Sequence, residues 1–191
     1  MSCYQKYVEK KVVCDLLRIE NGGQQHLYLL DWHKSESDVV SQMVYRLKSN
    51  NSAQALKFYG KILAAALSHS TDTTEFAGVI PIPSSKKTSV HALILAEEIA
   101  TATGLPLLNV LEKTEAPEQK TLSKTERRAG TSIHLKPNLN EEFTSDHVHP
   151  LKYVFVDDIL TTGESFKQSC HILAGHQDNL AVTLFFRSKS E

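Results

Sequence analysis

The chain has 191 residues, of which 41% are apolar and 23% charged, with a formal net charge of -1. This composition is that of an ordinary globular protein and excludes a disordered or fibrous chain, while the near-neutral charge argues against general nucleic-acid binding. No apolar run approaches the roughly 18 residues of a membrane helix, and the N-terminus has no leader-like stretch, so we expect a cytoplasmic protein. Three cysteines without CxxC spacing are expected to be free thiols: Cys3, Cys14 and Cys170.

The N-terminal part predicts a β-hairpin followed by two helices. Two β-rich runs, KVVCDLLRIE and QHLYLLDW, flank the turn residues NGGQ and predict a hairpin over about residues 11 to 32. Apolar residues then recur at helical spacing over residues 40–47 and 55–67, with Ser52 as the N-cap of the second helix. We expect a hairpin region, residues 1–36, and an α/β domain, residues 37–191, that includes both helices.

From Phe76 onward, short apolar strands alternate with helices. The predicted strands are FAGVIPIP, LPLLNVL, YVFV and LAVTLFF. The helices are SVHALILAEEIATATG, closed by Gly104, and GESFKQSCHILAG, with an apolar stripe of Phe166, Cys170 and Leu173. This order predicts an α/β fold with a parallel sheet flanked by helices. Residues 112–130 are almost entirely polar and predict a loop or lid.

The most informative stretch is YVFVDDILTTGES, residues 153–165. Its four apolar residues predict a buried strand, so Asp157 and Asp158 should emerge where an open α/β sheet binds ligands. Adjacent carboxylates resist desolvation unless ligand hydroxyls or a hydrated cation meet them. The next residues open a helix whose free N–H groups attract a phosphate, and they are Thr161, Thr162, Gly163, Glu164 and Ser165. The stretch therefore predicts a receptor for a sugar phosphate.

This stretch resembles the phosphoribosyl diphosphate signature of type I phosphoribosyltransferases. The resemblance implies that Asp157 and Asp158 hold the ribose hydroxyls and that Thr161 to Ser165 bind the 5-phosphate. Together with MVYRLKSNNSAQALKFYGKILAAAL, GVIPIPSSKK and APEQKTLSKTERR, in this order, it resembles the ComF family over about residues 40–186. An N-terminal zinc ribbon is common in that family, and here a hairpin stands in its place.

Two more segments supply candidate residues. The resemblance implies that the turn after FAGVIPIP binds pyrophosphate, and a plain turn with solvated lysines is the alternative; its residues are Ser84, Ser85, Lys86 and Lys87. In the polar loop, Arg127 or Arg128 is the best candidate to stabilise a leaving diphosphate, because a guanidinium fork matches phosphate oxygens. A solvated helical turn is the alternative there.

Several other residues carry no predicted chemistry. His91 is expected to be packed or exposed without a chemical role. His147 and His149 lack a third metal ligand, which favours a surface loop. Tyr28 and Trp32 are expected to form a local hydrophobic anchor.

Two functions follow from the resemblance. The first is a phosphoribosyltransferase that binds phosphoribosyl diphosphate with Mg²⁺, the ion being held through the ligand near Asp157 and Asp158. Its acceptor is not named by the sequence. The second is a non-catalytic ComF-like adaptor in DNA uptake or regulation that keeps the phosphate pocket. The expected partners are a small sugar phosphate and, for the adaptor, the DNA-uptake machinery; the oligomeric state is open, with a dimer as one option.

Overall fold

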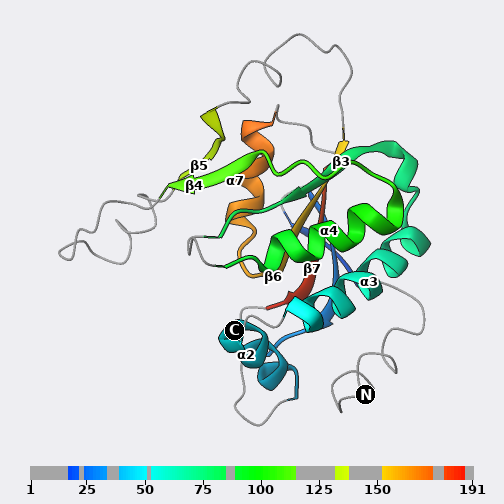
Figure 1. Ribbon diagram of the computed structural model, residues 1–191, viewed down its shortest axis with the longest axis vertical. Coiled ribbons are helices and arrows are strands. Elements are labelled where there is room, and N and C mark those ends of the chain that lie inside the picture. Colours follow the sequence, from blue (N-terminus) through cyan, green and yellow to red (C-terminus); the bar gives the residue numbers. More distant parts are fainter. Residues whose placement is uncertain are drawn as a thin grey trace, which may run out of the picture.

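The central feature of the protein is a sheet of five strands in the order β1-β2-β7-β6-β3 (Figure 1). The computed structural model describes residues 17–21, 24–33, 39–50, 53–84, 89–114, 132–137, 152–173 and 179–187. The strands are β1 (Leu17–Asn21), β2 (Gln24–Asp31), β3 (Phe76–Pro81), β6 (Lys152–Leu160) and β7 (Leu180–Phe186). All neighbours are parallel except β1 and β2. The predicted parallel α/β sheet is confirmed.

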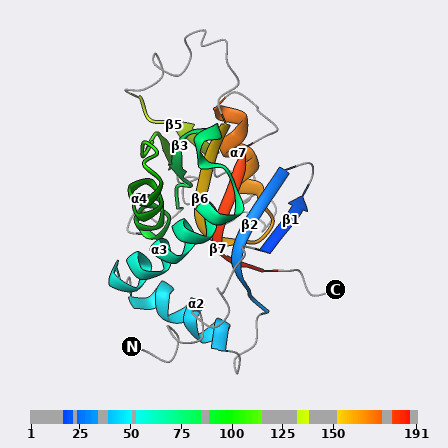
Figure 2. The ribbon, with the colours of Figure 1, turned by 90° about the vertical axis from the view of Figure 1, so that its right-hand side faces the viewer.

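Helices cover both faces of this sheet. They are α2 (Val39–Asn50), α3 (Ala53–Ser70), α4 (His91–Thr103) and α7 (Glu164–Ile172), with a short 3-10 turn, η1 (Thr73–Glu75). Figure 2 shows α3 and α4 on one side of the sheet and α7 on the other. The helices predicted from apolar spacing are therefore confirmed, and α4 ends at Gly104 in the left-handed conformation, φ 74°. Among the described residues, no helix combines the length and apolar character needed to cross a bilayer.

The alternation of side chains along β6 divides the core into two layers. Val154 and Val156 point into the cluster that contains α3 and α4, whereas Tyr153 and Phe155 point into the cluster that contains α7. The ring of Phe155 lies 5.3 Å from that of Phe166, edge to face. A strand that is buried on both faces is held firmly, so its C-terminal end is a rigid place for a functional group.

The N-terminal hairpin joins the main sheet. β1 pairs with β2 as predicted, and β2 then pairs in parallel with β7, with Leu27 opposite Val182. Tyr28 is buried and packs against Phe186, in agreement with its expected role as an anchor. The division into residues 1–36 and 37–191 stays a prediction, and Ser52 lies outside the described residues.

The predicted strand LPLLNVL is wrong in part. This segment makes a single parallel bridge to β3, between Leu107 and Val79. The N–H of Val79 donates to the carbonyl of Pro106 at 2.9 Å, and the N–H of Leu108 donates back at 2.8 Å. Pro106 has no N–H of its own, which helps to explain why the ladder does not continue.

A second sheet lies beside α7 and was not predicted. It consists of β4 (Leu111–Thr114) and β5 (Ser132–Leu135), paired antiparallel. The expectation of a polar loop over residues 112–130 is therefore wrong for 112–114, which belong to β4. Residues 115–131, which connect the two strands, lie outside the described part of the chain.

β6 extends further than predicted. The apolar run YVFV indicated an end at Val156, but β6 continues to Leu160 because β7 pairs with it along this length, with Asp157 opposite Thr183 and Leu160 opposite Phe186. β3 ends earlier, at Pro81. The last hydrogen bond between the segment of β3 and β6 runs from the N–H of Ile82 to the carbonyl of Val156, at 2.8 Å. Beyond this point, no strand in the described part of the chain pairs with this edge of β6.

Gly78 provides a test of how tightly β3 is held. A Cβ atom at this position would lie 2.6 Å from Leu108 Cδ1 and 3.0 Å from the carbonyl oxygen of Pro106. Because the carbonyl is backbone and cannot rotate away, we expect Gly78→Ala to lower the free energy of unfolding by about 1–3 kcal/mol in urea denaturation. Ala65→Ser, on the exposed side of α3, should change it by less than about 0.5 kcal/mol. Unchanged stability of Gly78→Ala would show that residues 106–108 are not packed against β3.

Candidate functional site

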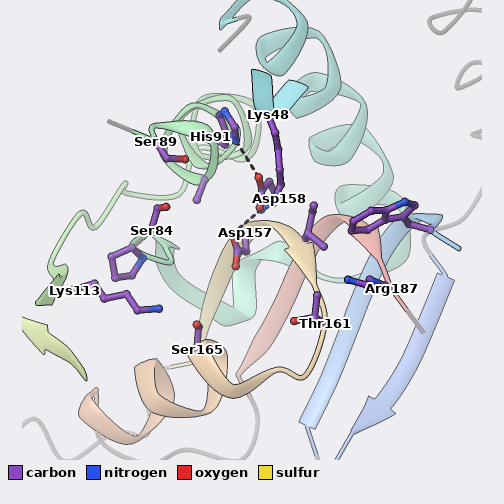
Figure 3. Close-up of a pocket in the computed structure, with 14 residues that line it drawn as sticks. Lys48, Ser84, Ser89, His91, Lys113, Asp157, Asp158, Thr161, Ser165 and Arg187 are labelled. Atoms are coloured by element: carbon purple, nitrogen blue, oxygen red, sulfur yellow. Dashed lines mark hydrogen bonds and ion pairs between the residues drawn. The ribbon is translucent and has the colours of Figure 1, made fainter. Parts of the chain in front are cut away.

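A cavity of about 570 Å³ lies at the carboxyl ends of the parallel strands. Its polar lining comes from the strands β4 and β6 and the helices α2, α4 and α7, and from the segments that follow β2, β3, β6 and β7 (Figure 3). The residues are Trp32, Lys48, Ser84, Ser89, His91, Lys113, Asp157, Asp158, Thr161, Ser165 and Arg187. Five of these, Ser84, Asp157, Asp158, Thr161 and Ser165, are predicted site residues. In open α/β sheets, ligands bind in such a crevice at the carboxyl ends of the strands.

Asp157 and Asp158 lie on the part of β6 that β3 does not cover. The carboxylate of Asp157 accepts a 2.8 Å hydrogen bond from the backbone N–H of Asp158. Asp158 lies 3.0 Å from Nδ1 of His91, and its side chain is only 19% exposed. Figure 3 shows Asp158 directed toward His91 and Lys48, whereas Asp157 points away from them toward Ser165. The two acids therefore face different parts of the cavity.

The surroundings separate the two acids electrostatically. Burial, followed by the negative charge of Asp158, raises the pKa of Asp157 well above its usual value. Burial also acts to raise the pKa of Asp158, but the hydrogen bond from His91 and the positive charge of Lys48 outweigh it, so this pKa is lowered. At neutral pH, Asp158 is the stable anion of the pair. Asp157 is the acid whose ionised form a hydroxyl donor or a cation would stabilise most.

His91 and Lys48 were not predicted to belong to the site. His91 is packed, as expected, but it also bonds Asp158, 67 residues away in the sequence. A signal for it was present, because it is the first residue of α4 and comes shortly after Lys87, where the predicted pyrophosphate loop ends. Lys48, near the end of α2, carried no such signal.

The predicted phosphate loop leads directly into α7. Gly163 is the N-cap residue and has φ 74°, a conformation that glycine adopts without strain. Gly163 has no side chain to cap the helix, and the N–H of Glu164 makes a long bond of 3.4 Å to Thr162 Oγ1. Glu164 is exposed and accepts a bond from Gln168, one turn along the helix, which directs its charge along α7. The first turn of α7 thus retains N–H groups for an anion.

A smaller cavity of about 120 Å³ adjoins this loop. All five residues of the predicted phosphate loop line it, together with Asp157 and Thr183. Thr183 is 2% exposed, and its Oγ1 has no hydrogen-bond partner in the described part of the chain. The loop therefore borders a small space, lined by both polar and apolar side chains, between itself and β7.

The remaining predicted residues divide into two groups. Ser84 borders the main cavity, and a further cavity of about 390 Å³ continues from it past Ser89 and Lys113 toward β4. Other predicted residues lie outside the described part of the chain, so their roles stay predictions: Ser85, Lys86, Lys87, Arg127 and Arg128, with His147, His149, Cys3 and Cys14. Cys170 is a free, buried thiol, as expected.

Comparison with known proteins finds similarity only at the level of three-dimensional structure. No protein-family profile matches the chain, and no curated protein is similar in sequence. Orotate phosphoribosyltransferase from Aeropyrum pernix aligns over 97% of this chain and 82% of its own, at 16% identity and a TM-score of 0.40. Adenine phosphoribosyltransferase from Leishmania tarentolae aligns over 89% and 94%, at 10% identity and 0.41. The enzyme from Saccharomyces cerevisiae aligns over 96% and 90%, at 14% identity and 0.42. At these scores the superpositions are loose.

The two acids should affect stability in opposite directions. Because the pKa of Asp157 is raised in the folded protein, its ionisation costs stability as pH increases above about 4, and Asp157→Asn should be more stable than the parent at pH 8. Because the pKa of Asp158 is lowered, it contributes stability above about pH 4, and Asp158→Asn should be less stable at pH 8. The Asp157→Asn difference, measured by urea denaturation, should shrink toward pH 4, whereas the Asp158→Asn difference should persist at pH 4 and disappear only as the pH falls through the lowered pKa of Asp158 in the folded protein. Equal effects of the two substitutions would contradict this account of the pair.

Proposed function

We propose that the protein binds 5-phosphoribosyl diphosphate in the main cavity. The observation that supports this most strongly is the convergence of Asp157, Asp158, Thr161 and Ser165 on one cavity at the open end of β6. Paired acids suit a vicinal diol, and a helix N-terminus suits a phosphate. The segment from Asp157 to Ser165 is continuous in sequence, so the two subsites have a fixed separation. A pentose 5-phosphate carries the diol on its ring and the phosphate on the adjoining exocyclic carbon, so both groups belong to one small molecule.

The ribose hydroxyls would donate to the two acids. Asp158 is prepared to accept, because its contact with His91 and the charge of Lys48 stabilise its anion. Asp157 is directed away from His91 and toward Ser165, on the side where the sugar would lie. Because Asp157 is buried, its negative charge is unfavourable while it has no partner. The carboxylate has already lost most of its hydration, so accepting hydrogen bonds from the ligand would cost little further dehydration.

The 5-phosphate would lie at the start of α7. Free N–H groups of the first turn and the hydroxyls of Thr161 and Ser165 supply donors, and the helix dipole favours the negative charge. The carboxylate of Glu164 is turned along the helix by its bond to Gln168, which reduces its repulsion of a phosphate. Any residue with a Cβ at position 163 would strain the turn.

The diphosphate would lie on the side of the acids where Ser84 and Lys113 are found. Figure 3 shows both residues directed toward the cavity, across from Arg187. Lys113 supplies a positive charge from β4, at the beginning of the segment that leads to Arg127 and Arg128. Those two arginines, with Ser85, Lys86 and Lys87, remain our candidates for further diphosphate contacts.

Magnesium fits the donors that the site offers. Mg²⁺ prefers oxygen ligands, and the cavity supplies the carboxylates of Asp157 and Asp158 and several hydroxyls. The described residues contain no group of three His, Cys, Asp or Glu side chains that could hold a metal by themselves. We therefore infer that the ion is held mainly by diphosphate and ribose oxygens near the two acids. When bound, it would neutralise negative charge on the diphosphate.

The site would support transfer by positioning and charge stabilisation. An acceptor would form a bond to the anomeric carbon, and the bond from that carbon to the diphosphate oxygen would break with its electron pair, releasing pyrophosphate. Lys113 lies where it can counter the charge of the leaving group. A ComF-like adaptor in DNA uptake would instead use the same pocket to bind phosphoribosyl diphosphate without releasing pyrophosphate.

Calorimetry with ribose 5-phosphate, and with phosphoribosyl diphosphate and Mg²⁺, tests the pocket. The unchanged protein should bind both, and Asp157→Asn combined with Asp158→Asn should weaken both by about 100-fold, because several hydrogen bonds to charged acceptors are lost. Glu97→Gln, at an exposed position of α4, also removes one negative charge and should bind normally. Unchanged affinity of the double variant would refute the assignment.

A pyrophosphate-release assay then separates the two functions. Release that depends on an added acceptor indicates a transferase, whereas binding of phosphoribosyl diphosphate without release over a panel of bases and aromatic acids favours the adaptor. A chain that binds neither sugar phosphate is inconsistent with both.

A further inference from the structure

The main cavity extends beyond the groups that a sugar diphosphate requires. Ser84 and Lys113 lie on one side of the two acids, and Arg187 lies on the other (Figure 3). Displacement at the anomeric carbon places the leaving diphosphate and the incoming atom on opposite faces of the sugar. If the diphosphate lies toward Ser84, the acceptor must approach from the side of Arg187.

Trp32 and Arg187 form one fixed unit, which we call the Trp-Arg wall. The guanidinium carbon of Arg187 lies 5.2 Å from the centre of the Trp32 ring, within the range of a cation-π contact. Trp32 is 6% exposed, and its Nε1 donates to Ser41 Oγ at 2.9 Å. The hydroxyl of Ser41 in turn donates to the carbonyl of His33 at 3.1 Å. The orientation of the indole is thus set by α2 and by the end of β2.

Backbone bonds hold the Trp-Arg wall to the ends of three neighbouring strands. The N–H of Trp32 donates to the carbonyl of Phe186 at 2.7 Å, and the N–H of Arg187 donates to the carbonyl of Leu160 at 2.8 Å. These bonds connect β2 to β7 and β7 to β6. The wall is therefore positioned by the same strand that carries Asp157 and Asp158, and a ligand would not have to order it.

The chemistry of the Trp-Arg wall indicates what it would bind. A guanidinium that stacks on an indole keeps its N–H edge available for a carboxylate or another acidic oxygen. Among the described residues, no ion pair occupies Arg187, and its side chain is only partly buried. Lys48 borders the same cavity and adds positive charge. Ile159, also in the lining, offers an apolar surface for a flat ring.

We propose that the Trp-Arg wall is the acceptor subsite and that it selects a planar acceptor carrying a carboxylate or another acidic oxygen. This inference rests on the proposed function, because the acceptor is defined by the sugar that it would receive. In the transfer, a lone pair of the acceptor bonds to the anomeric carbon, the electron pair of the broken bond leaves with pyrophosphate, and any proton on the attacking atom passes to water.

Matched pairs of probes test the charge requirement directly. Orotate and uracil differ by a carboxylate, and nicotinate and nicotinamide differ in having a carboxylate or an amide. Each is titrated by calorimetry into the protein saturated with ribose 5-phosphate, and also without it. We expect each acid to bind at least about tenfold more tightly than its neutral partner, the scale of one hydrogen-bonded charge.

Variants of Arg187 assign this preference to the Trp-Arg wall. Arg187→Gln should weaken the binding of the two acids by about tenfold or more. The affinities for uracil, nicotinamide and ribose 5-phosphate should change by less than about twofold. Arg187→Lys keeps the charge but not the planar fork and should recover part of the loss. Lys57→Gln removes one positive charge from an exposed position of α3 and should bind every probe normally. Circular dichroism and thermal melting confirm that each variant is folded.

Two results would overturn the proposal. One is equal affinity for the acid and the neutral member of each pair in the unchanged protein. The other is an Arg187→Gln variant that loses ribose 5-phosphate as strongly as the acids, which would place Arg187 in the sugar-phosphate site. If the acids bind through Arg187 but ribose 5-phosphate does not bind at all, the selectivity of the wall is upheld and the proposed function fails.

Discussion

The unequal length of two neighbouring strands determines where the main cavity of this protein lies. β3 ends at Pro81, and the N–H of Ile82 makes the last bond from its side to β6. β6 continues to Leu160 because β7 still supports it on the opposite edge. Two prolines, Pro81 and Pro83, cannot donate to a ladder, so the chain after β3 turns away from the sheet. Asp157 and Asp158 occupy the edge that is left open, on a strand made rigid by the core.

This arrangement places a group that is unfavourable for folding where a ligand can compensate for it. Burial and the neighbouring anion raise the pKa of Asp157, whereas His91 and Lys48 stabilise the charge of Asp158. The charge of Asp157 is thus unfavourable in the free protein and leaves this acid ready for hydroxyl donors or a cation, a compromise common at functional sites. The helix that begins at Glu164 then supplies the positive end of a dipole one short turn away.

Much of the fold could be predicted from local pattern. The helical spacing in α3, α4 and α7, the apolar run of β7 and the left-handed Gly104 are all encoded by neighbouring residues. The end of β6 is not, because Ile159 and Leu160 remain in the strand through their pairing with β7. The pairing of β4 with β5 was missed for a related reason, since it joins segments that 17 residues separate, and neither strand shows a long alternating pattern.

Apart from Ser84, the lining of the main cavity could be predicted only where its residues are continuous in sequence. Residues 157–165 carry both acids and the phosphate loop, and they do border connected cavities. Lys48, His91 and Arg187 come from α2, α4 and the end of β7, so only the sheet order brings them to the acids. His91 in particular changes the interpretation, because it distinguishes the two aspartates, which the sequence presents as equivalent.

The most direct test of the central claim is a crystal structure of the protein soaked with ribose 5-phosphate and Mg²⁺. The account predicts a phosphate against the N–H groups at the start of α7 and the ribose hydroxyls within hydrogen-bonding distance of Asp157 and Asp158. A phosphate bound elsewhere, with both acids unchanged and out of reach of the sugar, would contradict it.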